Sequence, residues 1–248
     1  MIDLHLHLLP GVDDGPETLE QSLAMCRQAA AEGCVALVAT PHQRRDEWRT
    51  DDPAPLQARL DELAARCGAA PRLYLGGEVR VDSELLADLE RPGRGGVLTL
   101  AGSRYLLLEL DPEGIGPDPV ELAAELVRRG FAPVVAHPEL TPFLWGEEDL
   151  IERVVAAGGL LQTTAMSVTG QFGRAVRERV WSLLDADLVH FVASDAHRPD
   201  WRPPGLARAH ALLAERLGLA TAQRLTVANP MAVIENRSLA AEPARETG

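Results

Sequence analysis

The stretch Ile2-Asp3-Leu4-His5-Leu6-His7 sets a pattern that the chain repeats: a short apolar run ends in side chains that can bind a metal or hold a ligand. Six later runs end in the same way. The polar residues that close or follow the seven runs are His5 and His7, His42, Glu78, Glu109, His137, Gln162, and Asp195 with His197. If the runs are parallel strands, their carboxyl ends meet at one rim, where the chemistry of a β/α barrel lies.

Stretches with apolar residues at helical spacing separate these runs. The spacing predicts helices within residues 19–30, 56–64, 83–89, 120–129, 150–157, 175–184 and 206–217. Pro16 suits the first turn of the first helix. Strands that alternate with helices imply a parallel sheet, and continuous apolar runs imply strands buried on both faces. The sequence therefore predicts an α/β fold, with a closed or nearly closed barrel of seven strands.

The composition limits the classes of function. A net charge of −13 argues against a general affinity for nucleic acid or for an anionic membrane. All 24 basic residues are arginine, which excludes Schiff-base lysine chemistry, a P-loop and the carboxylated lysine of many amidohydrolases. A cysteine-dependent phosphatase needs an arginine six positions after its cysteine, whereas Glu32, Thr40 and Leu73 stand there.

The length, termini and cysteines predict one domain in the cytoplasm. A barrel of about 250 residues is a single unit, so we expect one domain over residues 1–237 and a frayed tail over 238–248. We expect no signal peptide and no membrane insertion, because no apolar run approaches the ~20 residues that a membrane helix needs. Cys26, Cys34 and Cys67 fit no metal spacing and are interpreted as reduced thiols.

Nine acid or imidazole side chains form the candidate metal site. Side chains two apart on a strand share a face, so His5 pairs with His7, and Asp195 pairs with His197 in the same way. Glu78 and Glu109 follow apolar runs, where a charge is costly unless it is paired or bound to metal. The nine candidates are His5, His7, Asp14, His42, Glu78, Glu109, His137, Asp195 and His197. This number suits two or three ions, and five imidazoles favour zinc, manganese or iron over magnesium.

These motifs resemble those of a known superfamily. They are His5-Leu-His7-Leu-Leu-Pro-Gly-Val-Asp-Asp14-Gly, Thr40-Pro-His42, Gly77-Glu78, Ala136-His137-Pro-Glu and Ser194-Asp195-Ala-His197. Together they are similar to the polymerase and histidinol phosphatase (PHP) superfamily. Leu-Pro-Gly-Val-Asp-Asp-Gly narrows the resemblance to the bacterial manganese-dependent protein-tyrosine phosphatases of capsule and exopolysaccharide operons. The resemblance runs to about Asn236 and implies a distorted seven-stranded TIM-like barrel, (β/α)7, with a trinuclear metal centre.

The resemblance also implies roles for individual residues. His5, His7, Glu78 and Asp195 would hold one ion, Glu78 would bridge to a second with Glu109 and His137, and Asp14, His42 and His197 would hold a third. Arg202 matches an arginine that follows the last motif, and with Asp14, His42 and His197 it completes the candidate catalytic set. A second family arginine is replaced by Leu140, and Arg44, Arg45 or Arg198 would have to compensate.

The function that follows is hydrolysis of phosphotyrosine on a protein, by attack of a metal-bridging hydroxide. The resemblance implies Mn²⁺ in two or three copies, with iron, zinc or magnesium as alternatives, and a membrane-associated tyrosine kinase tail as substrate. The loop over residues 43–55 and the segment 140–145 would wall the site, with Trp48, Phe143 and Trp145 near the ring. Two alternatives stay open: a histidinol phosphatase or other small-molecule phosphoesterase, and a non-catalytic metal-binding scaffold. The sequence leaves the oligomeric state open.

Overall fold

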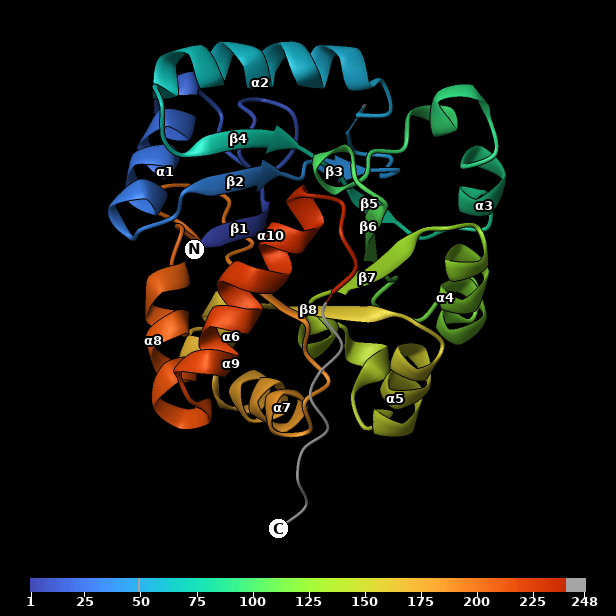
Figure 1. Ribbon diagram of the computed structural model, residues 1–248. Coiled ribbons are helices and arrows are strands. Elements are labelled where there is room, and N and C mark those ends of the chain that lie inside the picture. Colours follow the sequence, from blue (N-terminus) through green and yellow to red (C-terminus); the bar gives the residue numbers. More distant parts are fainter. Residues whose placement is uncertain (49, 240–248) are drawn as a thin grey trace.

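Short parallel strands occupy the centre of the molecule, and helices lie around them (Figure 1). The computed structural model describes residues 1–48 and 50–239, so residues 240–248 of the predicted tail lie outside the described residues. The strands of the described chain are β1 (Ile2–Leu6), β2 (Ala36–Ala39), β3 (His42–Gln43), β4 (Arg72–Leu75), β5 (Glu78–Arg80), β6 (Tyr105–Glu109), β7 (Ala132–Ala136), β8 (Leu160–Thr164) and β9 (Phe191–Ala193).

The predicted helices are all present, with shifted ends and several additions. The α-helices are α1 (Leu19–Ala31), α2 (Pro53–Cys67), α3 (Leu85–Asp88), α4 (Pro119–Arg128), α5 (Glu148–Ala156), α6 (Ala165–Thr169), α7 (Arg174–Asp185), α8 (Leu206–Leu217), α9 (Leu219–Gln223) and α10 (Asn229–Ile234). Within residues 1–48 and 50–239, four 3₁₀ turns span Pro92–Gly96, Leu100–Gly102, Pro138–Leu140 and Pro142–Leu144, and a π turn spans Arg224–Ala228. The expectation for Pro16 was wrong: α1 begins at Leu19, because Thr18 and Gln21 form a reciprocal capping box there.

The strands form two parallel sheets. One has the order β1-β2-β4, and the other has the order β3-β5-β6-β7-β8-β9. The predicted α/β architecture with parallel strands is confirmed, whereas a single closed seven-stranded barrel is not established. Pro41 separates β2 from β3, and Gly76 with Gly77 separates β4 from β5. The sheets approach each other where Asp195 N donates to His5 O and His7 N donates to Ala196 O, both at 2.8 Å.

Apolar residues cover both faces of these strands. On β6, Tyr105 and Leu107 belong to one buried cluster, and Leu106 and Leu108 belong to another. This alternation follows from the period of two along a strand, and it explains why the runs read as continuously apolar. Helix α2 packs against β4, and α10 packs against β1 (Figure 1). None of the helices within residues 1–48 and 50–239 combines the length and the apolarity that a membrane crossing requires.

Candidate metal centre

All nine candidate ligands lie near the carboxyl ends of β1, β2, β4, β6, β7 and β9 or in the loops that follow them. His5 is the second-last residue of β1, His7 directly follows the strand, and Asp14 comes from the following loop. The short strands β3 and β5 place His42 and Glu78 opposite each other in the parallel register. Glu109 closes β6, His137 follows β7, and Asp195 and His197 follow β9. The chain thus brings together residues that are up to 192 positions apart, from His5 to His197.

The ligand atoms form four overlapping groups within 4.8 Å. These groups are His7, Asp14, His42 and His197; His5, His137 and Asp195; His5, His7 and Glu78; and His42, Glu78 and Glu109. Each of the nine candidates belongs to at least one group. This grouping differs from the assignment that the resemblance implies. Asp195 is grouped with His5 and His137, and His7 is grouped with Asp14, His42 and His197.

Buried polar atoms without hydrogen-bond partners converge in this cluster. Among the described side chains, these atoms include His5 Nε2, His7 Nε2, Asp14 Oδ1, His42 Nδ1 and Glu78 Oε2. Leaving a buried polar atom unpaired costs about 1–3 kcal/mol, so native proteins rarely do it without a reason. Five such atoms that face one another have the donor chemistry of a metal site, and the residues present therefore fit a divalent cation.

Neighbouring side chains hold the imidazoles in the orientation that exposes these atoms. Gln162 Oε1 accepts from His5 Nδ1 at 2.8 Å, and Asp13 Oδ2 accepts from His7 Nδ1 at 2.7 Å. Each Nε2 then lies 3.4–3.5 Å from oxygens of Glu78 and Asp195. This is how supporting carboxylates and amides orient ligand histidines. The sequence indicated only a turn at Asp13. The structure shows two roles, because Asp13 accepts from Gly15 N at 3.0 Å within the turn and also accepts from His7 Nδ1.

Charge pairs stabilise the cluster. Burial favours neutral Glu78, but the imidazoles of His42, His5 and His137 hold the pKa of this carboxyl well below its usual range. Burial also favours neutral His137, but the hydrogen bond from its Nε2 to Glu78 Oε1 (2.7 Å) outweighs burial and raises its pKa to about 9. Protons therefore supply the positive charge that these carboxylates require, and a metal ion could replace those protons.

Two ligand candidates occupy strained backbone conformations. The φ angles of His137 and Asp195 are +33° and +52°, in the left-handed region that non-glycine residues seldom adopt. Arg202 is similar, with a φ of +54°. Such conformations cost about 1–3 kcal/mol and cluster at functional sites, where surrounding contacts enforce them. Here the turns after β7 and β9 direct the side chains back toward the cluster.

A cavity of about 290 Å³ opens onto the cluster and contains three arginines. Arg202 pairs with Asp195, Arg45 pairs with Glu109, and Arg80 lines the same cavity. Leu140 also lines it. Of the three arginines expected to compensate for Leu140, only Arg45 faces this cavity, because Arg44 pairs with Asp82 and Asp88 and Arg198 pairs with Glu17. Sequence reasoning missed Arg80, although it lies two positions after Glu78 on one strand face.

The predicted walls are present in part. Arg45 comes from the loop after His42, and Leu140 and Thr141 come from the segment before Trp145. Trp48 stacks on His42 with ring centroids 5.0 Å apart. Trp145 instead donates to Glu139 O, at 3.1 Å. The loop is also shorter than expected, since Gln43 belongs to β3 and Pro53 begins α2.

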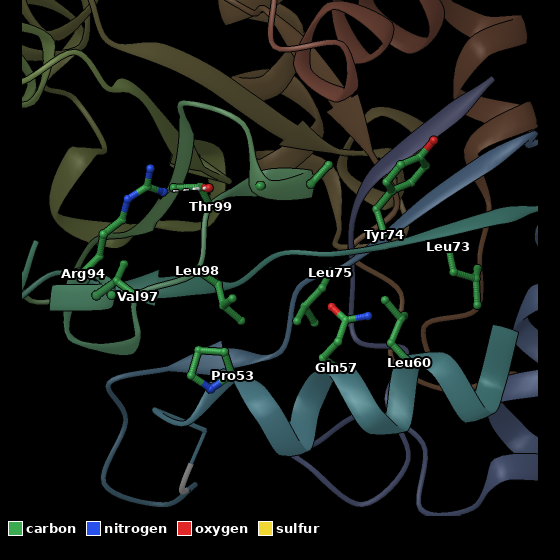
Figure 2. Close-up of a pocket in the computed structure, with 13 residues that line it drawn as sticks. Pro53, Gln57, Leu60, Leu73, Tyr74, Leu75, Arg94, Val97, Leu98 and Thr99 are labelled. Carbon is green, nitrogen blue, oxygen red and sulfur yellow. Dashed lines mark hydrogen bonds between the residues drawn. The ribbon is translucent and has the colours of Figure 1, made fainter.

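A larger cavity, of about 570 Å³, lies elsewhere (Figure 2). Its walls come from α2, with Pro53, Gln57 and Leu60; from β4; and from the segment 93–102. None of the described residues that line it is His, Asp or Glu. It lacks groups that could bind a metal or transfer a proton at neutral pH, so the smaller cavity is the candidate site.

Comparison with known proteins agrees with this geometry. The family model described as "Capsular polysaccharide synthesis, CpsB/CapC" matches residues 1–235. The chain belongs to the CpsB/CapC family. The sequence motifs predicted a resemblance to the phosphatases of capsule and exopolysaccharide operons, and this family membership confirms that prediction.

Several relatives in the CpsB/CapC family are tyrosine-protein phosphatases by name. YwqE of Bacillus subtilis is 30% identical over 246 residues, which is 98% of this chain and 95% of YwqE. CpsB of Streptococcus pneumoniae is 29% identical over 241 residues, covering 94% and 98% of the two chains. A structure from a crystallographic study of these two "unique metal-dependent tyrosine phosphatases" matches with a TM-score of 0.91 at 29% identity, covering 98% of each chain.

More distant structures share only the fold. An organophosphorus hydrolase variant from Deinococcus radiodurans matches with a TM-score of 0.58 at 15% identity, covering 94% of this chain and 92% of the hydrolase. This likeness supports the α/β arrangement of parallel strands and carries no information on substrate.

Proposed function

We propose that this chain is a metal-dependent phosphatase that hydrolyses phosphotyrosine on a protein, with a role in capsule or exopolysaccharide synthesis. The observation that carries the proposal is the convergence of five buried nitrogen and oxygen atoms that make no hydrogen bond, beside a cavity with three guanidiniums. Donors of this type suit divalent cations, and guanidiniums suit phosphate. The names of YwqE and CpsB, which match most of the chain, support the same activity.

The nine candidate residues would hold two or three ions. Five imidazoles and four carboxylates suit Mn²⁺, which we propose, with iron, zinc or magnesium as alternatives. When bound, the ions would supply an activated water as nucleophile and countercharge for the phosphoryl oxygens. Asp13 and Gln162 keep His7 and His5 in the required tautomer. Two sheets joined at β1 and β9 would behave as one distorted seven-stranded barrel, in a single domain over residues 1–237.

Arg202 would bind the phosphoryl group, while Asp14, His42 and His197 would complete the reactive end of the cluster. Arg202 is suited to this role because its guanidinium lies on Asp195 and within 3.4 Å of His197 Nε2. The substrate would be the tyrosine-containing tail of a membrane-associated kinase, and the three free thiols support a cytoplasmic location.

The test compares phosphate release from a phosphotyrosine peptide and from histidinol phosphate, with Mn²⁺-loaded and chelated protein. We expect the loaded protein to prefer the peptide and chelation to abolish turnover. A preference for histidinol phosphate would move the chain to small-molecule metabolism, and turnover that survives exhaustive chelation would overturn the metal-dependent mechanism. Metal bound without hydrolysis of either substrate would favour a binding scaffold.

A further inference from the structure

The candidate cavity contains two guanidiniums that share one carboxylate. Arg45 contacts Glu109 through both Nε, at 2.9 Å from Oε2, and Nη2. Arg80 approaches the same carboxylate from the neighbouring strand, with Nη1 at 3.4 Å from Oε1, and its Nη2 lies 3.0 Å from Asp111. Arg80 and Glu109 are register partners on β5 and β6, so the strands fix this proximity.

Glu109 has two guanidinium neighbours, although Arg80 lies closer to Asp111 than to Glu109. A single arginine with a two-point contact already matches a carboxylate, yet two are present, and both line the cavity with about a quarter of their side chains exposed. Arg202 adds a third guanidinium to the same cavity. Arginines that are partly solvated and gathered around a cavity are suited to bind a phosphate dianion through several N–H groups.

We infer that Arg45 and Arg80 form an anion-binding pair that holds the non-bridging oxygens of the phosphoryl group, together with Arg202. The inference rests on the proposed function and deepens it. If Glu109 binds a metal ion, part of its charge is withdrawn from the two guanidiniums, which then have N–H groups available for phosphate. Leu140 lines this cavity without offering a donor, so the phosphate contacts beyond those of Arg202 come from the loop after β3 and from β5.

The experiment measures binding of inorganic phosphate to metal-loaded protein by calorimetry, beside metal content and the KM for a phosphotyrosine peptide. We expect Arg45→Gln and Arg80→Gln each to weaken phosphate binding roughly tenfold or more, the size expected for a hydrogen bond to a charged group. KM should rise in parallel, with metal content unchanged. Arg198→Gln is the matched control, because this arginine pairs with Glu17 outside the cavity.

A gain-of-function variant strengthens the test. Leu140→Arg in the Arg80→Gln background should recover most of the lost phosphate affinity, since it returns a guanidinium to the same cavity. Unchanged phosphate affinity in both Gln variants would overturn the inference, and loss of metal from them would assign the pair to holding Glu109 instead. Wild-type protein that binds phosphate but does not hydrolyse the peptide would contradict the proposed function and leave the anion-binding pair intact.

Discussion

Two cavities of this molecule, one beside α2 and β4 and one at the candidate metal centre, differ in almost every respect that bears on function. The larger, of about 570 Å³, has walls of leucine, glycine and proline with few charged groups (Figure 2). The smaller, of about 290 Å³, is lined by three arginines, four carboxylates and three histidines. Size and apolarity usually mark ligand sites, but here the smaller cavity has the chemistry. The difference teaches that buried atoms without partners identify this site better than volume does.

The largest expected effect removes the carboxylate at the centre of the small cavity. Glu78 contacts His5, His7, His42 and His137. Losing a residue that only supports a metal ligand reduces activity by up to about a hundredfold. Because Glu78 would itself bind the metal, Glu78→Gln should reduce turnover by more than that. Bound metal per chain, measured by mass spectrometry, should fall with it. Gln57→Ala, in the larger cavity, should change neither. Normal metal content and turnover in Glu78→Gln would remove the distinction between the cavities.

The second prediction uses the protons that occupy the small cavity. With a pKa of about 9, His137 is protonated at pH 7 in metal-free protein, and the pKa values of His5 and His7 are also raised. Metal binding must displace these protons, so the apparent affinity should rise about tenfold per pH unit for each proton released. Calorimetry at pH 7 in two buffers of different ionisation enthalpy measures the release. Equal binding enthalpies in both buffers would show that the imidazoles are already neutral.

The same shift sets a direction for stability. Because the folded pKa of His137 lies above its unfolded value of about 6.5, its contribution to the stability of the metal-free protein is complete below pH 6.5. That contribution is lost as the pH rises through about 9.

The strands were predictable because seven apolar runs end in recognisable polar residues. The short strands β3 and β5 were not, since two or three residues are too few for periodicity to appear. Yet these strands place His42 opposite Glu78 and Arg80 opposite Glu109. The motifs alone were enough to predict which residues belong to the candidate cluster. The distances that group its members depend on register and on left-handed turns at His137 and Asp195, which no local pattern indicates.

The third prediction concerns the larger cavity. Leu60 on α2 is buried beside it, and Leu60→Ala should destabilise the protein by about 2–4 kcal/mol through lost burial and an enlarged void. The kcat and KM of the folded fraction should not change, since the residue lies outside the candidate site. Chemical denaturation measures the loss of stability, and activity assays at a temperature 20 °C below the thermal midpoint measure the folded protein alone. A changed KM at full folding would connect this cavity to catalysis and weaken the comparison.

The smallest expected effect lies at the rim of the site. Trp201 is 54% exposed, and its ring meets that of His197 edge-on at 5.6 Å, with Arg202 Cζ 5.8 Å from its centroid. An exposed aromatic ring beside the proposed phosphate site can contact the phenyl ring of the substrate, a contact worth about 0.5–1.5 kcal/mol.

Trp201→Ala should therefore raise the KM for a phosphotyrosine peptide about threefold. It should leave phosphate binding unchanged, because the anion contacts belong to the arginines. Trp145→Ala is the matched control, since that ring is 44% exposed but donates to Glu139 O and does not meet the ring of a candidate ligand as Trp201 does. An equal change in both variants would mean that neither tryptophan distinguishes the aromatic leaving group, and specificity would then rest on the charged cavity alone.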